Sequence, residues 1–339
     1  MFRQLLEKLT RREDLTADEA ASAMDAIMEE RATPSQMAGL LMGLAMKGER
    51  PPEVVGLARA MRNHAVAFAT SGGDAIDVCG TGGDGAGTFN ISSIAALVVA
   101  AAGVRVAKHG NRSVSSRCGS ADVFEALGVK TAAPVPVVQR SLDEAGIAFL
   151  FAPSFHPSMR HAAGVRKELG LRTAFNLLGP LTNPARPRRQ LVGVPRPELT
   201  ELLARALARL GSDRAWVVHG ADGLDEISTT GYTKVSECRD GAVNTFYLHP
   251  SDVGLPKAGR AALAGGDASE NAAIARAVLG GEPGARRDIV VLNAAAALLV
   301  AGRARDLREG LAIASASLDE GKAAAMLDAM VKASQGEQA

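Results

Sequence analysis

Five glycines lie within eight residues of this sequence, between Gly80 and Gly87. They follow a short apolar run, 75–79, with the length of a buried strand, and they precede an apolar helical pattern over 91–104. A strand, a glycine loop and a helix can together bind phosphate, because glycine lets backbone N–H groups approach an anion and the helix N-terminus adds partial positive charge. The sequence therefore predicts an anion site in this loop.

The loop matches the fingerprint of a dinucleotide site only in part. Gly80, Gly82 and Gly85 have the G-x-G-x-x-G spacing of such a site. A dinucleotide fold also needs an acidic residue at the end of the next strand, where it binds the ribose. That position is occupied by Lys108 and His109. The basic pair argues against a dinucleotide-dependent oxidoreductase.

A P-loop fits no better. Residues 82–88 have its spacing but lack the lysine that precedes its final hydroxyl residue. Asp84 lies inside the loop, where a carboxylate would repel a bare phosphate and suits sugar hydroxyls, an amine or a metal ion instead. A glycine-rich turn without a ligand is the remaining alternative, and the direct passage from strand to helix disfavours it.

A second polar loop follows the next predicted strand and extends from Lys108 to Ser116. It offers basic side chains, serine hydroxyls and a glycine, which are typical phosphate-binding groups. Lys108, Arg112 and Arg117 cluster there, and we expect the acidic residues to lie elsewhere. Two anion-binding loops at the ends of successive strands suit a ligand with two separated phosphate groups.

Three stretches of the chain resemble one enzyme family. They are 77–122, which contains both loops, 176–184 with the sequence NLLGPLTNP, and 222–226 with the sequence DGLDE. They resemble the anthranilate phosphoribosyltransferases of tryptophan biosynthesis, and the resemblance covers nearly the whole chain. It implies a pentosyltransferase that transfers the phosphoribosyl group of 5-phosphoribosyl 1-pyrophosphate (PRPP) to the amine of anthranilate and releases pyrophosphate, the second step from chorismate.

The resemblance also implies which residues bind PRPP. Those in and after the glycine loop are Gly80, Gly83, Asp84, Thr88, Asn90, Ile91, Ser92 and Ser93. Those in and after the basic loop are Lys108, His109, Gly110, Asn111, Arg112, Ser113, Val114, Ser115, Ser116 and Ser120. The family more often has threonine where Ser93 stands, and either residue supplies a hydroxyl. Such donors would stabilise the negative charge that builds on the leaving pyrophosphate.

A magnesium site is expected at Asp225 and Glu226. Adjacent carboxylates repel each other unless a cation lies between them, and Mg²⁺ prefers one or two carboxylates together with substrate phosphates and water. An isolated Asp-Glu pair is usually a solvated surface pair. The surrounding DGLDE sequence, which matches the family, favours the metal site, and the resemblance adds Ser92 as a further oxygen ligand.

The resemblance places four residues on anthranilate: Gly80, His109, Asn111 and Arg166. Arg166 would contact the carboxylate, since a guanidinium can make a two-pronged contact with it. His109 could serve as a general base, but attack by an aromatic amine on a cation-like sugar carbon needs little such help, and we expect a positioning role. We expect His156 to be structural.

Composition bounds the function classes. The chain has 339 residues, of which 47% are hydrophobic, and a formal net charge of +1. This near balance argues against a nucleic-acid partner. The three cysteines, Cys79, Cys118 and Cys238, have no metal-ligand spacing and are expected to be reduced packing residues. With no signal-peptide pattern and no apolar run long enough to span a bilayer, we expect a cytoplasmic protein without a membrane partner.

The hydrophobic patterns predict an α/β fold in two domains. Residues 1–70 are expected to form a small helical domain, to which the family adds a segment at about 165–187. Residues 71–339 are expected to form a larger PRPP-binding domain with a mostly parallel sheet and flanking helices. Predicted strands are 75–79, 104–107, 147–152, 190–194, 216–219, 235–239 and 242–248, the last two forming a hairpin.

The N-terminal helices have leucine and methionine on more than one face, and the family's homodimer would use this surplus. Two same-fold alternatives remain open at this point. A pyrimidine nucleoside phosphorylase would have a different second loop, without the sequence KHGNRS at 108–113. A non-catalytic, nucleic-acid-binding relative would have a basic groove and would lack Asn111, Arg166, Asp225 or Glu226.

Overall fold

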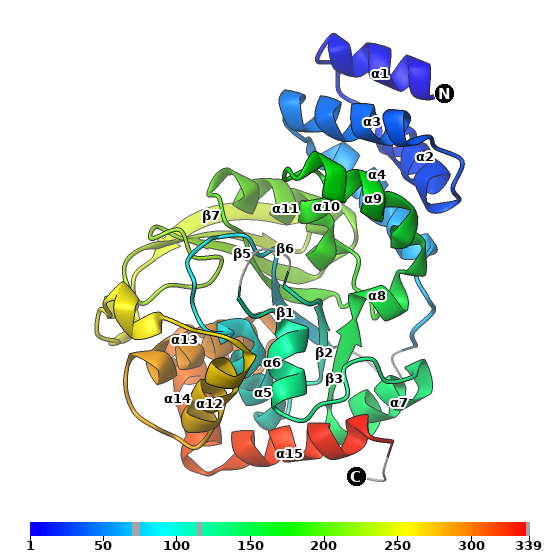
Figure 1. The fold of residues 1–339 in the computed structure, drawn as a ribbon. Coiled ribbons are helices and arrows are strands. Elements are labelled where there is room, and N and C mark those ends of the chain that lie inside the picture. Colours follow the sequence, from blue (N-terminus) through cyan, green and yellow to red (C-terminus); the bar gives the residue numbers. More distant parts are fainter. Residues whose placement is uncertain (70–74, 114–116, 337–339) are drawn as a thin grey trace.

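The computed structural model describes residues 1–69, 75–113 and 117–336. At its centre is a seven-stranded sheet in the order β3-β2-β1-β4-β5-β6-β7 (Figure 1). Neighbouring strands from β3 to β5 are parallel, and β6 and β7 join antiparallel. The strands are β1 (Ile76–Gly80), β2 (Val106–Gly110), β3 (Ile147–Phe151), β4 (Arg189–Gly193), β5 (Arg214–Gly220), β6 (Thr233–Arg239) and β7 (Ala242–Leu248).

All seven strands predicted from the sequence are present, each displaced by no more than about three residues at either end. The hairpin of β6 and β7 is confirmed, with Asp240 and Gly241 at its turn, both in the left-handed region. The fold class predicted from the sequence is therefore confirmed: a helical N-terminal part and an α/β part with a mostly parallel sheet.

Four helices form a bundle at the N-terminal end of the molecule (Figure 1). They are α1 (Phe2–Thr10), α2 (Ala17–Met28), α3 (Pro34–Lys47) and α4 (Pro51–Asn63). Thr16 begins α2 with the capping box that the sequence predicts: its hydroxyl accepts from the Glu19 N–H at 3.2 Å, and the Glu19 carboxylate accepts from the Thr16 N–H at 2.9 Å. Thr33 and Gln36 cap α3 in the same way.

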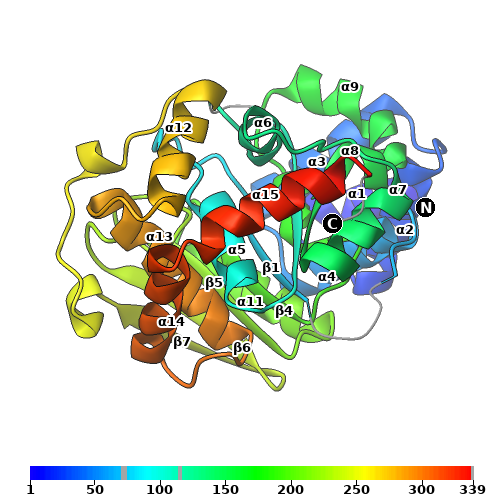
Figure 2. The ribbon, with the colours of Figure 1, turned by 90° about the horizontal axis from the view of Figure 1, so that it is seen from below.

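The remaining helices lie on both sides of the sheet. Helices α5 and α13 pack together under one face, with α14 and α15 beyond them (Figure 2), and α11 packs on the other face beside α4. Within the described ranges, no helix has the length and apolar character needed to cross a bilayer. These helices are α5 (Ile91–Ala101), α6 (Ser120–Ala126), α7 (Val135–Arg140), α8 (Ala152–Phe155), α9 (Arg160–Leu169), α10 (Phe175–Leu178), α11 (Glu198–Arg209), α12 (Ala268–Leu279), α13 (Ala285–Val300), α14 (Leu307–Asp319) and α15 (Lys322–Ser334).

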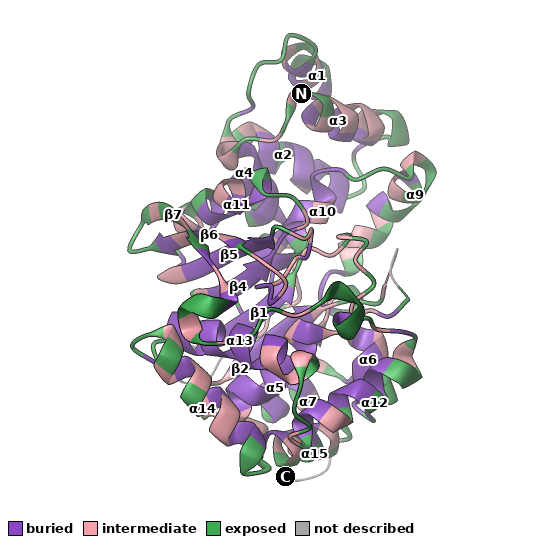
Figure 3. Ribbon diagram, turned by 90° about the vertical axis from the view of Figure 1, so that its left-hand side faces the viewer, coloured by how far each residue is buried: buried purple, intermediate pink, exposed green. Residues whose placement is uncertain are grey.

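Alternation along the strands separates two hydrophobic cores. In β5, Trp216 and Val218 face the core that contains α5 and α13, whereas Ala215 and Val217 face the core that contains α11. Both faces of the central strands are therefore buried, and these strands are mostly purple in Figure 3, whereas the edge strand β7 is largely exposed or intermediate. A parallel sheet covered on both faces leaves the ends of its strands as the place for a ligand.

The core of the helical bundle extends into distant parts of the chain. Leu5, Met24 and Leu44 belong to the same hydrophobic cluster as Phe175 in α10 and Leu203 in α11. Helix α9 also packs against α2 and α3. The bundle is thus completed by segments that lie far along the sequence.

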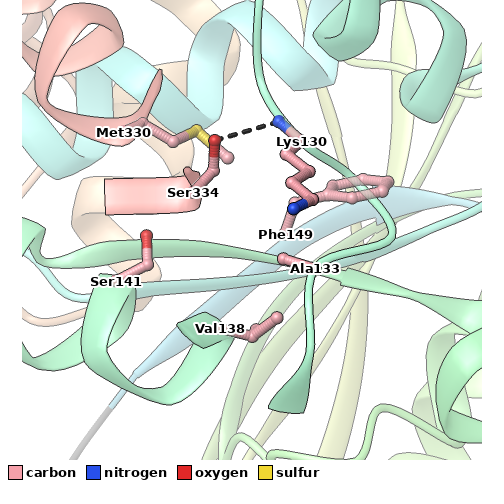
Figure 4. Close-up of a pocket in the computed structure, with 7 residues that line it drawn as sticks. All are labelled: Lys130, Ala133, Val138, Ser141, Phe149, Met330 and Ser334. Atoms are coloured by element: carbon pink, nitrogen blue, oxygen red, sulfur yellow. Dashed lines mark hydrogen bonds between the residues drawn. The ribbon is translucent and has the colours of Figure 1, made fainter. Parts of the chain in front are cut away.

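A small cavity lies between β3 and α15, away from the carboxyl ends of the strands (Figure 4). Its volume is about 10 Å³, and the Lys130 N–H donates to the Ser334 hydroxyl across its edge at 2.9 Å. This space admits about one water molecule at most, so the cavity cannot hold a substrate. Its lining residues are Lys130, Ala133, Val138, Ser141, Phe149, Met330 and Ser334.

Candidate active site

The polar loops meet where the strand order reverses. The chain proceeds from β1 outward to β2 and β3, then returns to place β4 on the other side of β1. In open α/β sheets, ligands bind at the carboxyl ends of the strands at this switch point. The glycine loop follows β1, the basic loop follows β2, and Asp225 and Glu226 follow β5.

Asp225 lies directly against the glycine loop. Its Oδ2 accepts the Gly82 N–H at 2.9 Å. A Cβ on Gly193 would lie 1.5 Å from the Asp225 carbonyl oxygen, and a Cβ on Gly80 would lie 2.5 Å from its Oδ2. Glycine at these two strand ends therefore allows the Asp225 carboxylate to approach β1 and the Asp225 backbone to approach β4.

Glu226 reaches the other end of the loop. Its Oε1 accepts the Ser92 N–H at 3.0 Å, in the first turn of α5. The two carboxylates thus occupy N–H donors at both ends of the loop. A helix N-terminus favours a negative group at this position.

Burial and neighbouring acids raise the pKa of both Asp225 and Glu226. Burial raises the pKa of Asp225 to about 7, and Asp84 adds to the effect. Burial raises the pKa of Glu226 to about 8, with the Asp225 charge next in importance. Carboxylates in this condition are stabilised by a cation, so the donor set fits a hard divalent metal. Within the described residues, no group of three His, Cys, Asp or Glu side chains could hold a metal ion. An ion here would therefore also need hydroxyl, water and substrate oxygens as ligands.

Lys108 points back into the protein. Its side chain is 1% exposed, and its Nζ donates to the Val78 carbonyl at 2.5 Å and to the Ser92 hydroxyl at 3.4 Å. The ammonium group therefore lies beneath the glycine loop and the first turn of α5. Its charge lowers the pKa of Glu226 against the effect of burial.

The other basic side chains of the second loop are paired with acids. Arg112 donates to Asp122 at 3.0 Å and to Glu125 at 2.7 Å. Arg117 pairs with Glu270 at 3.3 Å. The expectation that the acidic residues lie elsewhere is wrong, because helices α6 and α12 bring these carboxylates to the loop. Ser113 also gives its N–H to Asp122, at 3.1 Å.

The structure places the rest of the predicted PRPP residues around these two loops. The Asp84 carboxylate accepts the Ala86 N–H at 3.2 Å, and Thr88 bridges to Ala264. Asn90 donates to the Cys118 carbonyl at 3.2 Å, which ties the two loops together. Gly83, Ile91, Ser93, Gly110, Asn111 and Ser120 complete the set, whereas Val114, Ser115 and Ser116 lie outside the described residues.

Two of these residues have unusual surroundings. The hydroxyl of Ser93 is buried and has no hydrogen-bond partner among the residues that the structure describes. The Ser120 hydroxyl donates to the Asn111 carbonyl at 3.3 Å, and a Cβ on Gly110 would lie 2.3 Å from that hydroxyl oxygen. Glycine at position 110 therefore permits the close approach of Ser120.

His109 is a buried, neutral imidazole. Its Nδ1 lies 3.1 Å from the Gly179 carbonyl, which can only accept, so Nδ1 carries the proton and Nε2 is left as an acceptor. Burial lowers the pKa of His109 to about 3, and the nearby ring of His156, 5.3 Å away between centroids, contributes. Burial likewise lowers the pKa of His156 to about 4.

Arg166 lies on α9, with its guanidinium carbon 5.2 Å from the centre of the Phe175 ring. Burial lowers its pKa, although the group stays charged at neutral pH. The stacking on Phe175 orients the guanidinium without using its N–H donors.

Sequence reasoning gave no role to Asp77, Asn183 or Arg172. Asp77 is fully buried, accepting the His109 N–H at 3.2 Å and the Asn183 side-chain N–H at 2.8 Å. Arg172 donates to the Gly82 carbonyl at 2.9 Å. A charged residue inside an apolar strand run was the available signal for Asp77, whereas no spacing in the sequence links Arg172 to the glycine loop.

Comparison with known proteins agrees with this architecture. Residues 3–65 match the glycosyl transferase family model for a helical bundle domain, and residues 72–324 match the model for its a/b domain. The chain is 58% identical over 331 residues to anthranilate phosphoribosyltransferase of Moorella thermoacetica, covering 98% of each chain. This chain belongs to the anthranilate phosphoribosyltransferase family.

Solved members of the family have the same fold. The Thermus thermophilus enzyme superposes with a TM-score of 0.93 at 46% identity, covering 98% of this chain and 99% of its own. The Saccharomyces cerevisiae enzyme, solved in complex with PRPP and Mg, gives a TM-score of 0.89 at 27% identity, covering 99% of this chain and 98% of its own. The yeast enzyme has also been solved with 4-fluoroanthranilate. Membership of this family favours neither the nucleoside phosphorylase nor the nucleic-acid-binding alternative.

Proposed function

We propose that this chain transfers the phosphoribosyl group of PRPP to anthranilate, as a step of tryptophan biosynthesis. In the reaction, the C1–O bond to pyrophosphate breaks, a bond from C1 to the amine nitrogen forms, and the amine loses a proton to solvent. The main supporting observation is the pair Asp225 and Glu226, which lie on the N–H donors at the two ends of the glycine loop. This arrangement places ligands for a cation beside a glycine loop whose remaining N–H groups can face the diphosphate that accompanies the cation.

Asp225, Glu226 and the Ser92 hydroxyl would hold Mg²⁺, with Asp84 nearby. The bound ion would neutralise part of the charge on the leaving pyrophosphate. Gly80, Gly83, Thr88 and the N-terminal turn of α5 would bind phosphate and ribose through N–H and hydroxyl donors. The second loop, from Lys108 to Ser120, would provide the remaining contacts. The yeast complex with PRPP and Mg supports this assignment.

Anthranilate would lie between the second loop and α9. Arg166 would pair with its carboxylate, and Asn111 and Gly80 would line the slot. With its pKa near 3, His109 is neutral and a poor base at neutral pH. It would therefore help to position the substrate and would not take up its proton.

The direct test follows the loss of anthranilate fluorescence on addition of PRPP and Mg²⁺. We expect turnover that requires all three components and stops when the metal is chelated with EDTA. A parallel reaction with a pyrimidine nucleoside and inorganic phosphate should give no free base. Absence of anthranilate consumption, or phosphorolysis in the parallel reaction, would contradict the assignment.

We infer a homodimer formed through the helical bundle. A groove of about 380 Å³ lies between α1 and α3, lined in part by Phe2 and Leu6, and Met46 at the end of α3 is 76% exposed. Apolar surface of this kind is stabilised when a second copy covers it. Sedimentation at micromolar concentration should give a dimer, and Met46→Glu should shift it toward monomer. A monomeric wild type would count against the inference.

A further inference from the structure

One arginine outside the assigned residues contacts the glycine loop. Arg172 lies in the connection between α9 and α10, shortly after the helix that contains Arg166. Its Nη2 donates to the Gly82 carbonyl at 2.9 Å. A Cβ placed on Gly83 would lie 1.5 Å from its Nη1. The guanidinium therefore occupies the space directly in front of Gly83.

The Gly82 residue is consequently fixed on both sides. Asp225 accepts its N–H at 2.9 Å, and Arg172 donates to its carbonyl at 2.9 Å. Gly82 and Gly83 both have left-handed backbones, with φ of +68° and +77°. Glycine has more conformations to lose than any other residue, so two such glycines in succession stay ordered only if other groups hold them.

The connection that bears Arg172 is itself anchored. Helix α9 ends at Gly170, which has a left-handed backbone with φ of +60°. The next residue after Arg172, Thr173, is buried and donates its N–H to the Asn176 side chain at 2.9 Å. The guanidinium is thus presented to the loop from a fixed point.

Two acids lie near the Arg172 guanidinium. Burial and Arg196 lower its pKa, and the charges of Asp225 and Asp84 partly offset that effect. In the part of the chain that the structure describes, the guanidinium has only the one hydrogen bond, to the Gly82 carbonyl. The contact therefore joins the acids, the glycine loop and the α9–α10 connection at one point.

We propose that Arg172 is a positioning residue for PRPP: its contact holds the Gly82–Gly83 segment in the conformation that presents the loop to the diphosphate. The proposal rests on the function proposed above for the same loop. Ordering the loop before the ligand arrives lowers the entropic cost of binding. Since Arg172 follows α9, the contact also ties the PRPP loop to the segment that contains Arg166.

The first test compares Arg172→Gln with Arg196→Gln in the full chain. Both variants lose one positive charge near the site, but only the first loses the contact to Gly82. Calorimetry of PRPP binding with Mg²⁺ present should give about ten-fold weaker affinity for Arg172→Gln and less than about three-fold change for Arg196→Gln. The melting temperature and the KM for anthranilate at saturating PRPP should move little in either variant.

A double-mutant cycle tests whether Arg172 acts through the glycine loop. Gly83→Ala would displace the guanidinium and would also strain a backbone at a φ of +77°, so only the first part of its effect should disappear once Arg172 is already glutamine. We expect the double variant to lose clearly less PRPP affinity than the product of the two single losses. Losses that multiply, or normal PRPP binding by Arg172→Gln, would overturn the proposal. Failure of the wild type to bind PRPP would instead overturn the proposed function, so the two failures are distinguishable.

Discussion

The two loops at the switch point are stabilised by different kinds of contact. The glycine loop has its backbone groups engaged by outside residues: Asp225 on the Gly82 N–H, Glu226 on the Ser92 N–H and Arg172 on the Gly82 carbonyl. The arginine side chains of the basic loop pair with nearby carboxylates, as Arg112 does with Asp122 and Glu125.

This difference shows that the number of cations in a loop is a poor measure of its anion-binding capacity. An arginine already paired with two carboxylates has little net field to offer a phosphate. Backbone N–H groups of an ordered loop that donate to no carboxylate keep their dipole for a phosphate, whatever the net charge. We therefore expect substitutions at the glycine loop to have larger effects than charge removal at the rim of the basic loop.

The largest effect is expected for Asp225→Asn with Glu226→Gln. Without the two charges, the site should lose its cation, and turnover should fall by about 10³-fold or more. The amide oxygens can still accept the two N–H groups, so the melting temperature should stay the same or rise. Steady-state kinetics and thermal unfolding provide the measurements.

The chain offers a matched control for this double variant. Asp319 and Glu320 follow a leucine, as Asp225 and Glu226 do, but they pair on the surface with Arg287 at 2.7 Å and Lys322 at 2.5 Å. Asp319→Asn with Glu320→Gln should leave turnover unchanged. Near-normal activity of Asp225→Asn with Glu226→Gln at ordinary Mg²⁺ concentration would contradict the proposed metal site.

Gly83→Val addresses the glycine loop itself. A β-branched side chain is strained at a φ of +77°, and its Cβ would displace the Arg172 guanidinium. We expect PRPP affinity, measured by calorimetry with Mg²⁺, to fall by about ten- to a hundred-fold.

Arg117→Gln is the corresponding change in the basic loop. The Arg117 side chain is 70% exposed and pairs with Glu270 on the surface, so PRPP affinity should change by less than about two-fold. Equal losses in Gly83→Val and Arg117→Gln would mean that charge, and not backbone geometry, governs binding.

Arg166→Ala tests the proposed anthranilate contact, which comes from α9 and from neither loop. Loss of a charge-assisted contact with the anthranilate carboxylate should raise the KM for anthranilate by about ten- to a hundred-fold. The KM for PRPP should move much less. Lys167→Ala, one residue further on α9 and exposed, should leave both values unchanged. A parallel rise in both KM values for Arg166→Ala would make Arg166 a residue that only holds the helix in place.

The smallest effect is expected at Asp77, whose buried side chain in β1 contacts His109 in β2; these are the two strands that precede the loops. In Asp77→Asn, one of the acceptors for the His109 N–H and the Asn183 side chain is replaced by a donor. Urea unfolding should reveal a loss of about 1–3 kcal/mol. Asp143→Asn, which breaks a surface pair with Arg105, should cost less than about 1 kcal/mol. Equal costs would mean that Asp77 is not a structural centre.

Local patterns in the sequence predict the elements well. Periodicity locates the strands, and Thr16 and Thr33 mark helix starts, because these signals lie within a few residues of one another. The tripeptide Leu-Asp-Glu shows that a local pattern alone does not locate the site. It occurs at 142–144, 224–226 and 318–320, and only the second lies at the strand ends.

The site depends on contacts that no spacing reveals. Asp122, Glu125 and Glu270 neutralise the basic loop because α6 and α12 fold back over it. Arg172, which follows α9, donates to Gly82, which follows β1, although the two residues lie far apart in the sequence. The contacts proposed for PRPP, anthranilate and Mg²⁺ stay predictions, as does the domain boundary near residue 70, which falls between the described ranges.

The shared core of the bundle has a consequence for the order of folding. Helices α1 to α4 end at Asn63, but their hydrophobic cluster also needs Phe175 of α10 and Leu203 of α11. A ribosome adds about 5–20 residues per second, so the first helices wait on the order of ten seconds for these partners. During that interval their apolar faces are exposed beside the exit tunnel. We expect nascent chains stalled before α10 to bind chaperones more strongly than chains stalled beyond α11.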